Sequence, residues 1–136
     1  MILETLMVGP LGVNCYIVGD DKTREAIVID PGGNARDILD TLRREQLKPV
    51  AIVNTHAHFD HLIALTELRE KTGAPFFLHA DEAKVLASAQ LGAKMFGFAM
   101  PQPQPADRLL RDGEEVRFGL STLKVMHTPG HSPGGI

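Results

Sequence analysis

Side chains that could bind a metal ion are concentrated in one short segment near the middle of the chain. Four of them fall within six residues, directly after an apolar run: His56, His58, Asp60 and His61. In extended backbone, residues two apart point to the same side, so His56 and His58 can offer ring nitrogens to one ion. Asp60 and His61 follow where the chain turns, and they suit a second ion about 3.5–4 Å from the first. The alternative is a set of surface histidines with Asp60 as a helix cap, but this density of ligands favours metal binding.

A second histidine pair lies in a loop rich in proline and glycine near the carboxyl end of the chain. His127 and His131 flank the segment Thr128-Pro129-Gly130 and follow another apolar run. Proline and glycine define a tight loop, which can aim an imidazole with little further loss of entropy. Either histidine could complete a three-histidine site with His56 and His58, and the spacing alone does not choose between them. Imidazole and carboxylate ligands with an open position suit Zn²⁺.

Other residues carry chemically useful groups but also have ordinary interpretations. Asp30 ends an apolar run before Pro31-Gly32-Gly33, where its carboxylate could orient a ligating imidazole or only form the turn. Cys15 lies inside an apolar run, which favours a core thiol over a nucleophile. His79 ends another such run, and we expect it to pack rather than to bind metal. The apolar segment 95–100 could form a wall of a substrate cleft or cover the core.

The elements that must position these residues alternate between β and α patterns. Strands are expected at 2–8, 15–18, 26–29, 49–54, 75–78, 108–110, 116–118 and 122–126. Helices are expected after an N-cap at Asn34, from Leu62 to a terminating Gly73, and from Asp81 to Ala89. The first three strands predict an antiparallel meander. Strands interleaved with helices predict a layered α/β architecture in a single domain, 1–136.

Composition and charge argue against nucleic-acid and membrane partners. The chain has 136 residues, of which 43% are hydrophobic and 23% charged, with a formal net charge of −3. Its lysines and arginines form no basic stripe, so nucleic acid is not expected as a partner. No apolar run reaches the roughly 20 residues of a membrane span and no signal sequence is visible, so we expect no membrane association and a cytoplasmic location. The single cysteine fits a reducing compartment.

Both histidine clusters resemble the metal motifs of the metallo-β-lactamase superfamily. The resemblance covers 56–61 and 127–134. Two weaker motifs, Asn14-Cys15-Tyr16 and Asp30-Pro31-Gly32-Gly33, are typical of its glyoxalase II-like (hydroxyacylglutathione hydrolase-like) branch. The resemblance therefore extends over nearly the whole chain.

The resemblance implies a fold and a ligand set. The fold is an α/β sandwich of αββα type. Because the family's ligand is the histidine after Pro-Gly, the role carries to His131, and His127 becomes a neighbour that orients the loop. The implied metal ligands are His56, His58, Asp60, His61 and His131, with Asp30 and His127 supporting them. Two zinc ions are implied for the complete enzyme, with Fe(II) as the alternative.

The implied reaction is hydrolysis of a thioester, such as an acyl-glutathione, by zinc-bound hydroxide that Asp60 holds and orients. An alternative of another class is a persulfide dioxygenase, which uses one Fe(II) held by two histidines and one carboxylate. The chain ends at Ile136, before the family's metal-bridging aspartate and final histidine ligand. We therefore expect a sandwich without its C-terminal strands and helix, and an inactive metal-binding fragment is a third interpretation.

Overall fold

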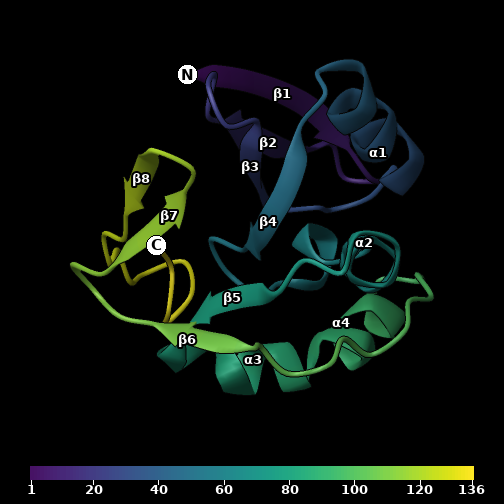
Figure 1. The fold of residues 1–136 in the computed structure, drawn as a ribbon. Coiled ribbons are helices and arrows are strands. Elements are labelled where there is room, and N and C mark those ends of the chain that lie inside the picture. Colours follow the sequence, from purple (N-terminus) through teal and green to yellow (C-terminus); the bar gives the residue numbers. More distant parts are fainter.

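A six-stranded mixed sheet forms the centre of the molecule (Figure 1). The computed structural model describes residues 1–136. In sheet order the strands are β1 (Ile2–Val8), β2 (Val13–Gly19), β3 (Glu25–Ile29), β4 (Lys48–Val53), β5 (Phe76–His79) and β6 (Arg108–Leu110). The first three form the predicted antiparallel meander, and β4, β5 and β6 continue the sheet in parallel with β3. A separate two-stranded sheet consists of β7 (Glu115–Phe118) and β8 (Ser121–Lys124).

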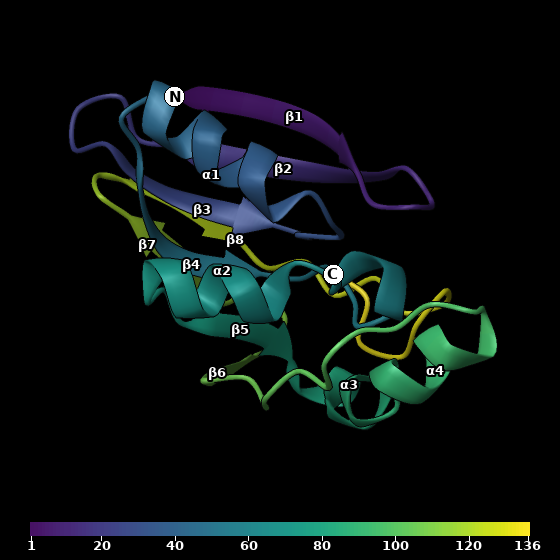
Figure 2. The ribbon, with the colours of Figure 1, turned by 90° about the vertical axis from the view of Figure 1, so that its right-hand side faces the viewer.

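Helices connect the parallel strands and cover one face of the large sheet. They are α1 (Ala35–Arg44), α2 (Leu65–Thr72), α3 (Ala83–Ala87) and α4 (Ala89–Met95), with 3-10 turns η1 (Phe59–His61) and η2 (Ala80–Glu82). In Figure 1, α1 and α2 lie on one side of β4 and the β7–β8 sheet lies on the other; Figure 2 shows α1 and α2 in front of the strands. No helix combines the length and the apolar character needed to cross a membrane. The layers are those of the expected α/β sandwich.

Alternation along β4 explains how one strand serves two cores. Ile52 belongs to the core that the large sheet shares with α1 and α2. Ala51 and Val53 belong to a second core, shared with Val116 and Phe118 of the small sheet. Successive side chains of a strand point to opposite faces, so an uninterrupted apolar run is what two covered faces require. The prediction of a strand buried on both sides is confirmed for this part of β4.

The predicted helices differ from the structure in three details. Asn34 occupies the N-cap position of α1 as predicted, but its side chain makes no capping hydrogen bond: its φ is 53°, and its Oδ1 accepts a hydrogen bond from the Gly9 amide at 2.9 Å instead. The helix expected from Leu62 begins at Leu65, because η1 occupies the preceding turn, although it ends at Gly73 as predicted, with a φ of 70°. The helix expected at 81–89 is divided at Ser88 into α3 and α4.

Candidate metal centre

The first metal loop, defined as residues 55–61, leaves the carboxyl end of β4 and is held by buried groups on both sides. Asn54 is fully buried, and its amide nitrogen donates hydrogen bonds to the carbonyls of His56 (3.2 Å) and His61 (2.9 Å). Gly32, in the turn after β3, packs directly on the loop, since a Cβ there would lie 2.3 Å from the Asp60 carbonyl oxygen. The Gly32 turn is therefore part of the site's scaffold, although the sequence indicated only a turn.

Three histidines from the two clusters converge at one point. The Nδ1 of His58 lies 3.2 Å from the Nε2 of His131, although the two residues are 73 positions apart. Ligand nitrogens of His56, His58 and His131 all lie within 4.8 Å of one another. Two nitrogens bound to one tetrahedral ion at about 2.0–2.1 Å are roughly 3.3 Å apart. The spacing of His58 and His131 is therefore that of two ligands of a common ion.

The hydrogen bonds of His56 leave one of its nitrogens free for a metal. The Thr55 hydroxyl donates to Asp30 Oδ2 at 2.6 Å, so it accepts from His56 Nδ1 at 2.9 Å. His56 is only 9% exposed, and its Nε2 is buried without any hydrogen-bond partner. Such an orphaned nitrogen is costly unless a ligand completes it. The residues present thus fit a metal ion at this position.

The charge state of His56 also suits a ligand. Burial, together with the positive charge of protonated His61, lowers the pKa of His56 to about 4, against the opposing effect of Asp30. The imidazole is therefore neutral at pH 7. Neutral imidazole is the form that binds metal ions.

A second group of possible ligands is built around His61. Asp30, 4% exposed, accepts from the Thr55 amide at 2.7 Å and lies 3.1 Å from His61 Nδ1. This contact directs the other nitrogen, His61 Nε2, toward Asp60 Oδ2 at 3.7 Å. Burial lowers the pKa of His61, but the hydrogen bond and charge of Asp30, with the charge of Asp60, outweigh it and raise that pKa. Asp30 both forms the turn, with a φ of 55°, and orients a candidate ligand.

The structure places His127 outside the group formed by His56, His58 and His131. Its ring stacks on His79 with 4.2 Å between centroids and 13° between planes, and its Nε2 lies 3.0 Å from the Pro133 carbonyl oxygen. This second contact bridges the second metal loop, defined as residues 127–135. The Nδ1 of His79 accepts from the Asp81 amide at 3.0 Å. Lone pairs of two stacked imidazoles run parallel rather than toward one point, so His79 and His127 suit packing better than chelation.

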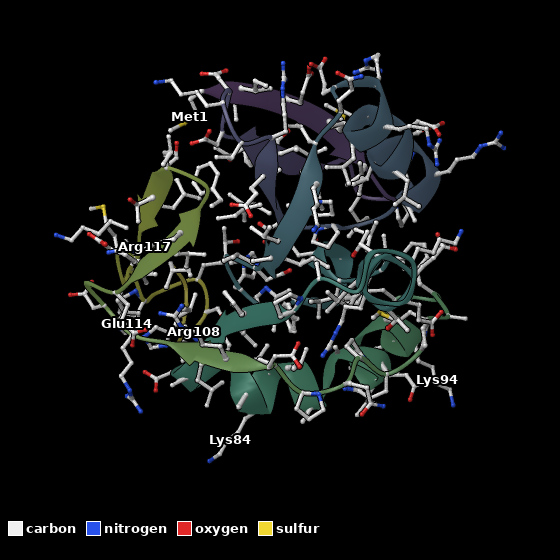
Figure 3. The ribbon with its side chains drawn as sticks, viewed as in Figure 1. Met1, Lys84, Lys94, Arg108, Glu114 and Arg117 are labelled. Atoms are coloured by element: carbon white, nitrogen blue, oxygen red, sulfur yellow. The ribbon has the colours of Figure 1, made fainter.

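An apolar cleft adjoins two of the three histidines, His58 and His131. Its volume is about 480 Å³, and its lining residues are Leu11, Ala57, His58, Phe59, Asp60, Val85, Ser88, Ala89, Gly92, Phe96 and His131. Phe96 is 68% exposed with its ring 5.4 Å from that of Phe59, whereas Met100 is buried in the core. The segment 95–100 therefore forms both a cleft wall and core. No lysine or arginine lines the cleft, and Lys84 and Lys94 project outward from α3 and α4 (Figure 3).

Cys15 lies in the core, as predicted. It has no exposed surface, and burial, together with the negative charge of Asp30, raises the pKa of its thiol to about 12. The thiol is therefore protonated at neutral pH and is a poor nucleophile.

Some residues that support the site were not found from the sequence. They are Asn54, Thr55, Glu82 and Ser132. A buried polar residue at the end of an apolar strand was a usable signal for Asn54. Nothing in the sequence pairs Glu82 with either histidine cluster.

Comparison with known proteins decides the family. The model of the metallo-beta-lactamase superfamily matches residues 8–136, a range that contains both metal loops. The chain belongs to the metallo-beta-lactamase superfamily. The resemblance inferred from the two histidine motifs is confirmed.

Relatives within the superfamily include hydrolases. The chain is 40% identical over 131 residues to the "Probable metallo-hydrolase YqgX" of Bacillus subtilis, covering 95% of this chain and 61% of that protein. It is 29% identical over 138 residues to the "Hydroxyacylglutathione hydrolase GloC" of Haemophilus influenzae, covering 100% of this chain and 65% of that protein. The chain thus spans less than two thirds of the length of either relative.

Solved superfamily structures share the fold. The BLEG-1 B3 metallo-beta-lactamase superposes with a TM-score of 0.87 at 38% identity, over 98% of this chain and 65% of that one. TTHA1623, solved in a di-iron-bound form, superposes with a TM-score of 0.85 at 36% identity, over 97% and 64%. The histidines and aspartates found here fit a dinuclear metal site, and the di-iron neighbour means that the fold does not by itself specify zinc.

Proposed function

We propose that this chain carries the metal-binding loops of a metal-dependent hydrolase that cleaves a thioester such as an acyl-glutathione. The observation that carries the proposal is the convergence of His58 and His131, 3.2 Å apart, beside the orphaned Nε2 of His56. In this proposal those three histidines hold the first ion. Asp60 and His61 contribute to the second.

The chemistry follows from the ligands and from one carboxylate. Zinc bound by such a set lowers the pKa of a coordinated water to about 7 and polarises a carbonyl oxygen, so hydroxide is available at neutral pH. Asp60, whose side chain is 23% exposed, lines the cleft. In this proposal it accepts a hydrogen bond from the attacking water and orients it. Asp30 keeps His61 in one orientation through its 3.1 Å contact.

The cleft suits a thioester in two respects. Its apolar wall, with Leu11, Phe59 and Phe96, can cover the acyl part of a substrate. Its titratable groups are His58, Asp60 and His131, all of which have other roles, so no general acid remains for the leaving group. A thiolate leaves without one, which favours a thioester over an amide. The relationship to a hydroxyacylglutathione hydrolase supports the same substrate class.

The test is hydrolysis of an acyl-glutathione by the zinc-loaded 136-residue chain, with a β-lactam as the comparison substrate. We expect thiol release that is lost in Asp60→Asn and kept in Asp40→Asn, a matched change at an exposed acid of α1. Thiol release by the longest available form of the protein but not by the 136-residue chain would show that the chain is an inactive metal-binding fragment, whereas zinc binding without thiol release by either form would contradict the proposal.

Metal content separates hydrolysis from the persulfide dioxygenase alternative. Two zinc ions in the longest available form of the protein would support the hydrolase. One iron per chain with oxygen consumption on a glutathione persulfide would support the dioxygenase instead.

A further inference from the structure

One buried carboxylate touches both metal loops. Glu82 has no exposed surface and ends η2, which directly follows β5. Its Oε1 accepts a hydrogen bond from the amide of Ala57, between His56 and His58, at 2.7 Å. The Ser132 hydroxyl, next to His131, lies 2.6 Å from each oxygen of the same carboxylate, and the Gly134 amide donates to Oε2 at 2.9 Å. A single side chain therefore connects the segments that carry three candidate ligands.

Every partner of Glu82 is a neutral donor. The carboxylate is bound by two backbone amides and one hydroxyl, with no lysine or arginine among them. A buried carboxylate without a cation is expensive, and it is tolerated only where hydrogen bonds satisfy its oxygens. Bonds to a charged acceptor are about twice as strong as neutral ones, which gives this connection unusual strength.

The second metal loop packs tightly against Glu82. Ser132 is 2% exposed. A Cβ at Gly134 would lie 2.7 Å from Glu82 Cγ and 2.8 Å from its backbone nitrogen, so the second metal loop rests directly on η2. This close contact determines how near the second metal loop lies to η2.

Most other hydrogen bonds of the second metal loop are internal. The Thr128 amide donates to the Gly135 carbonyl at 2.7 Å, and His127 contacts the Pro133 carbonyl. These bonds define the shape of the loop but not its distance from the first metal loop. The His127 amide donates outside the loop, to Asp112 Oδ1 at 2.9 Å. Just beyond the loop, the Ile136 amide donates to the Thr55 carbonyl of the first metal loop at 3.0 Å.

We propose that Glu82 is a positioning residue that holds the two metal loops at chelating distance, so that His131 meets His58 around one ion. The inference rests on the metal-binding part of the proposed function. It does not depend on which substrate is cleaved.

The test compares Glu82→Gln and Ser132→Ala with Glu70→Gln, the same chemical change at an exposed acid of α2. A glutamine at 82 keeps the size of the side chain, but its NH₂ cannot accept from an amide, so the contact with Ala57 or with Gly134 is lost. We expect zinc affinity to fall by about 10–100-fold in Glu82→Gln, as for other residues that orient metal ligands, and by less in Ser132→Ala. Glu70→Gln should bind as the wild type does.

The visible spectrum of the Co²⁺-saturated chain distinguishes positioning from a general loss of folding. If His131 is displaced, saturated Glu82→Gln shows a changed spectrum because one imidazole has been lost. Wild-type affinity in both variants, or weaker binding with an unchanged spectrum at saturation, would overturn the inference. If Glu82→Gln fails to fold, Ser132→Ala is judged by the same two criteria.

The outcome is separable from that of the proposed function. Zinc binding without thiol release, by the 136-residue chain and by the longest available form alike, would contradict the reaction, while the affinities and spectra of the variants would still decide the role of Glu82. A wild-type chain that binds neither zinc nor Co²⁺ would overturn both.

Discussion

The two metal loops reach the same point by different physical means. The first metal loop grows out of a buried strand, and Asn54, Asp30 and Gly32 hold it from beneath. The second metal loop lies at the surface, where His131 is exposed, and depends on its own internal bonds and on Glu82. The ligands of the first metal loop are therefore positioned by the core. The second metal loop takes its shape from its own hydrogen bonds, and contacts with the rest of the protein determine where it lies. We therefore expect substitutions in the first metal loop to lower both zinc affinity and the free energy of unfolding, and substitutions in the second metal loop to lower mainly zinc affinity.

The largest expected effect is on zinc binding when either loop loses its ligand. His56→Ala and His131→Ala should each weaken zinc binding by more than the roughly 10–100-fold that supporting residues cost. Isothermal titration with zinc measures this, with Lys94→Ala as the control, because that exposed side chain projects outward from α4 and takes no part in either metal loop (Figure 3). Equal binding by His131→Ala and wild type would contradict the assignment of His131.

The same variants should differ in the metal-free chain, and this is the sharpest test of the comparison. His56 is 9% exposed and bonded to Thr55, so His56→Ala should lower the free energy of unfolding by about 0.5–3 kcal/mol. His131 is exposed, and its replacement should change that energy by no more than about 0.5 kcal/mol. Urea unfolding in the presence of a chelator measures both. Equal destabilisation would remove the distinction between the loops.

Asp30→Asn should lower the zinc affinity of the first metal loop although no proposed ligand is removed. The change replaces a charged acceptor of Thr55 and His61, and we expect zinc affinity to fall by about 10–100-fold. Asp30 raises the pKa of His61, so the pKa of His61 should be lower in the variant. NMR titration of the metal-free histidine ring signals measures this shift. An unchanged His61 pKa would show that the 3.1 Å contact does not persist in solution.

The pH dependence of stability should come from the first metal loop. The pKa of His56 is lowered to about 4 from an ordinary 6.5, so the unfolded chain binds its proton more readily than the folded one. The stability that neutral His56 contributes is complete above pH 6.5 and is lost as the pH falls toward 4. His61, whose pKa is raised in the folded chain, contributes in the opposite direction, so the test is a difference between variants. In thermal unfolding of the metal-free chain, lowering the pH from 6.5 to 4 should cost the wild type more stability than it costs His56→Ala.

The smallest expected effect concerns the rate at which Cys15 is chemically modified. Because burial raises the pKa of this thiol to about 12, a thiol reagent at pH 8 should modify it only when the large sheet opens. His131→Ala should therefore leave the labelling rate unchanged, whereas His56→Ala should increase it. Fast labelling of native wild type would show that the sheet beneath the first metal loop is open. The urea-unfolded chain gives the control rate.

Much of this molecule was predictable because its signals are local. The spacing of His56 and His58 is that of two residues on one side of an extended backbone, and four ligands in six residues indicate metal without knowledge of the fold. The meander, the doubly buried β4 and the terminating Gly73 also follow from short-range patterns. Where prediction failed, a tertiary contact overrode a local preference: Asn34 would cap α1 by composition, but the Gly9 amide takes its side-chain oxygen.

By itself, the sequence determined the types of ligand and the strand ends that bear them, since residue chemistry and the period of a strand need no long-range information. It left His127 and His131 as alternatives until a family resemblance was considered, because spacing within one loop says nothing about what that loop faces. Only the tertiary structure brought His131 to within 3.2 Å of His58 and placed Glu82 beneath both loops. Such contacts join residues 50 and 73 positions apart, and the distance between them is set by how strands and turns pack rather than by any pattern along the chain.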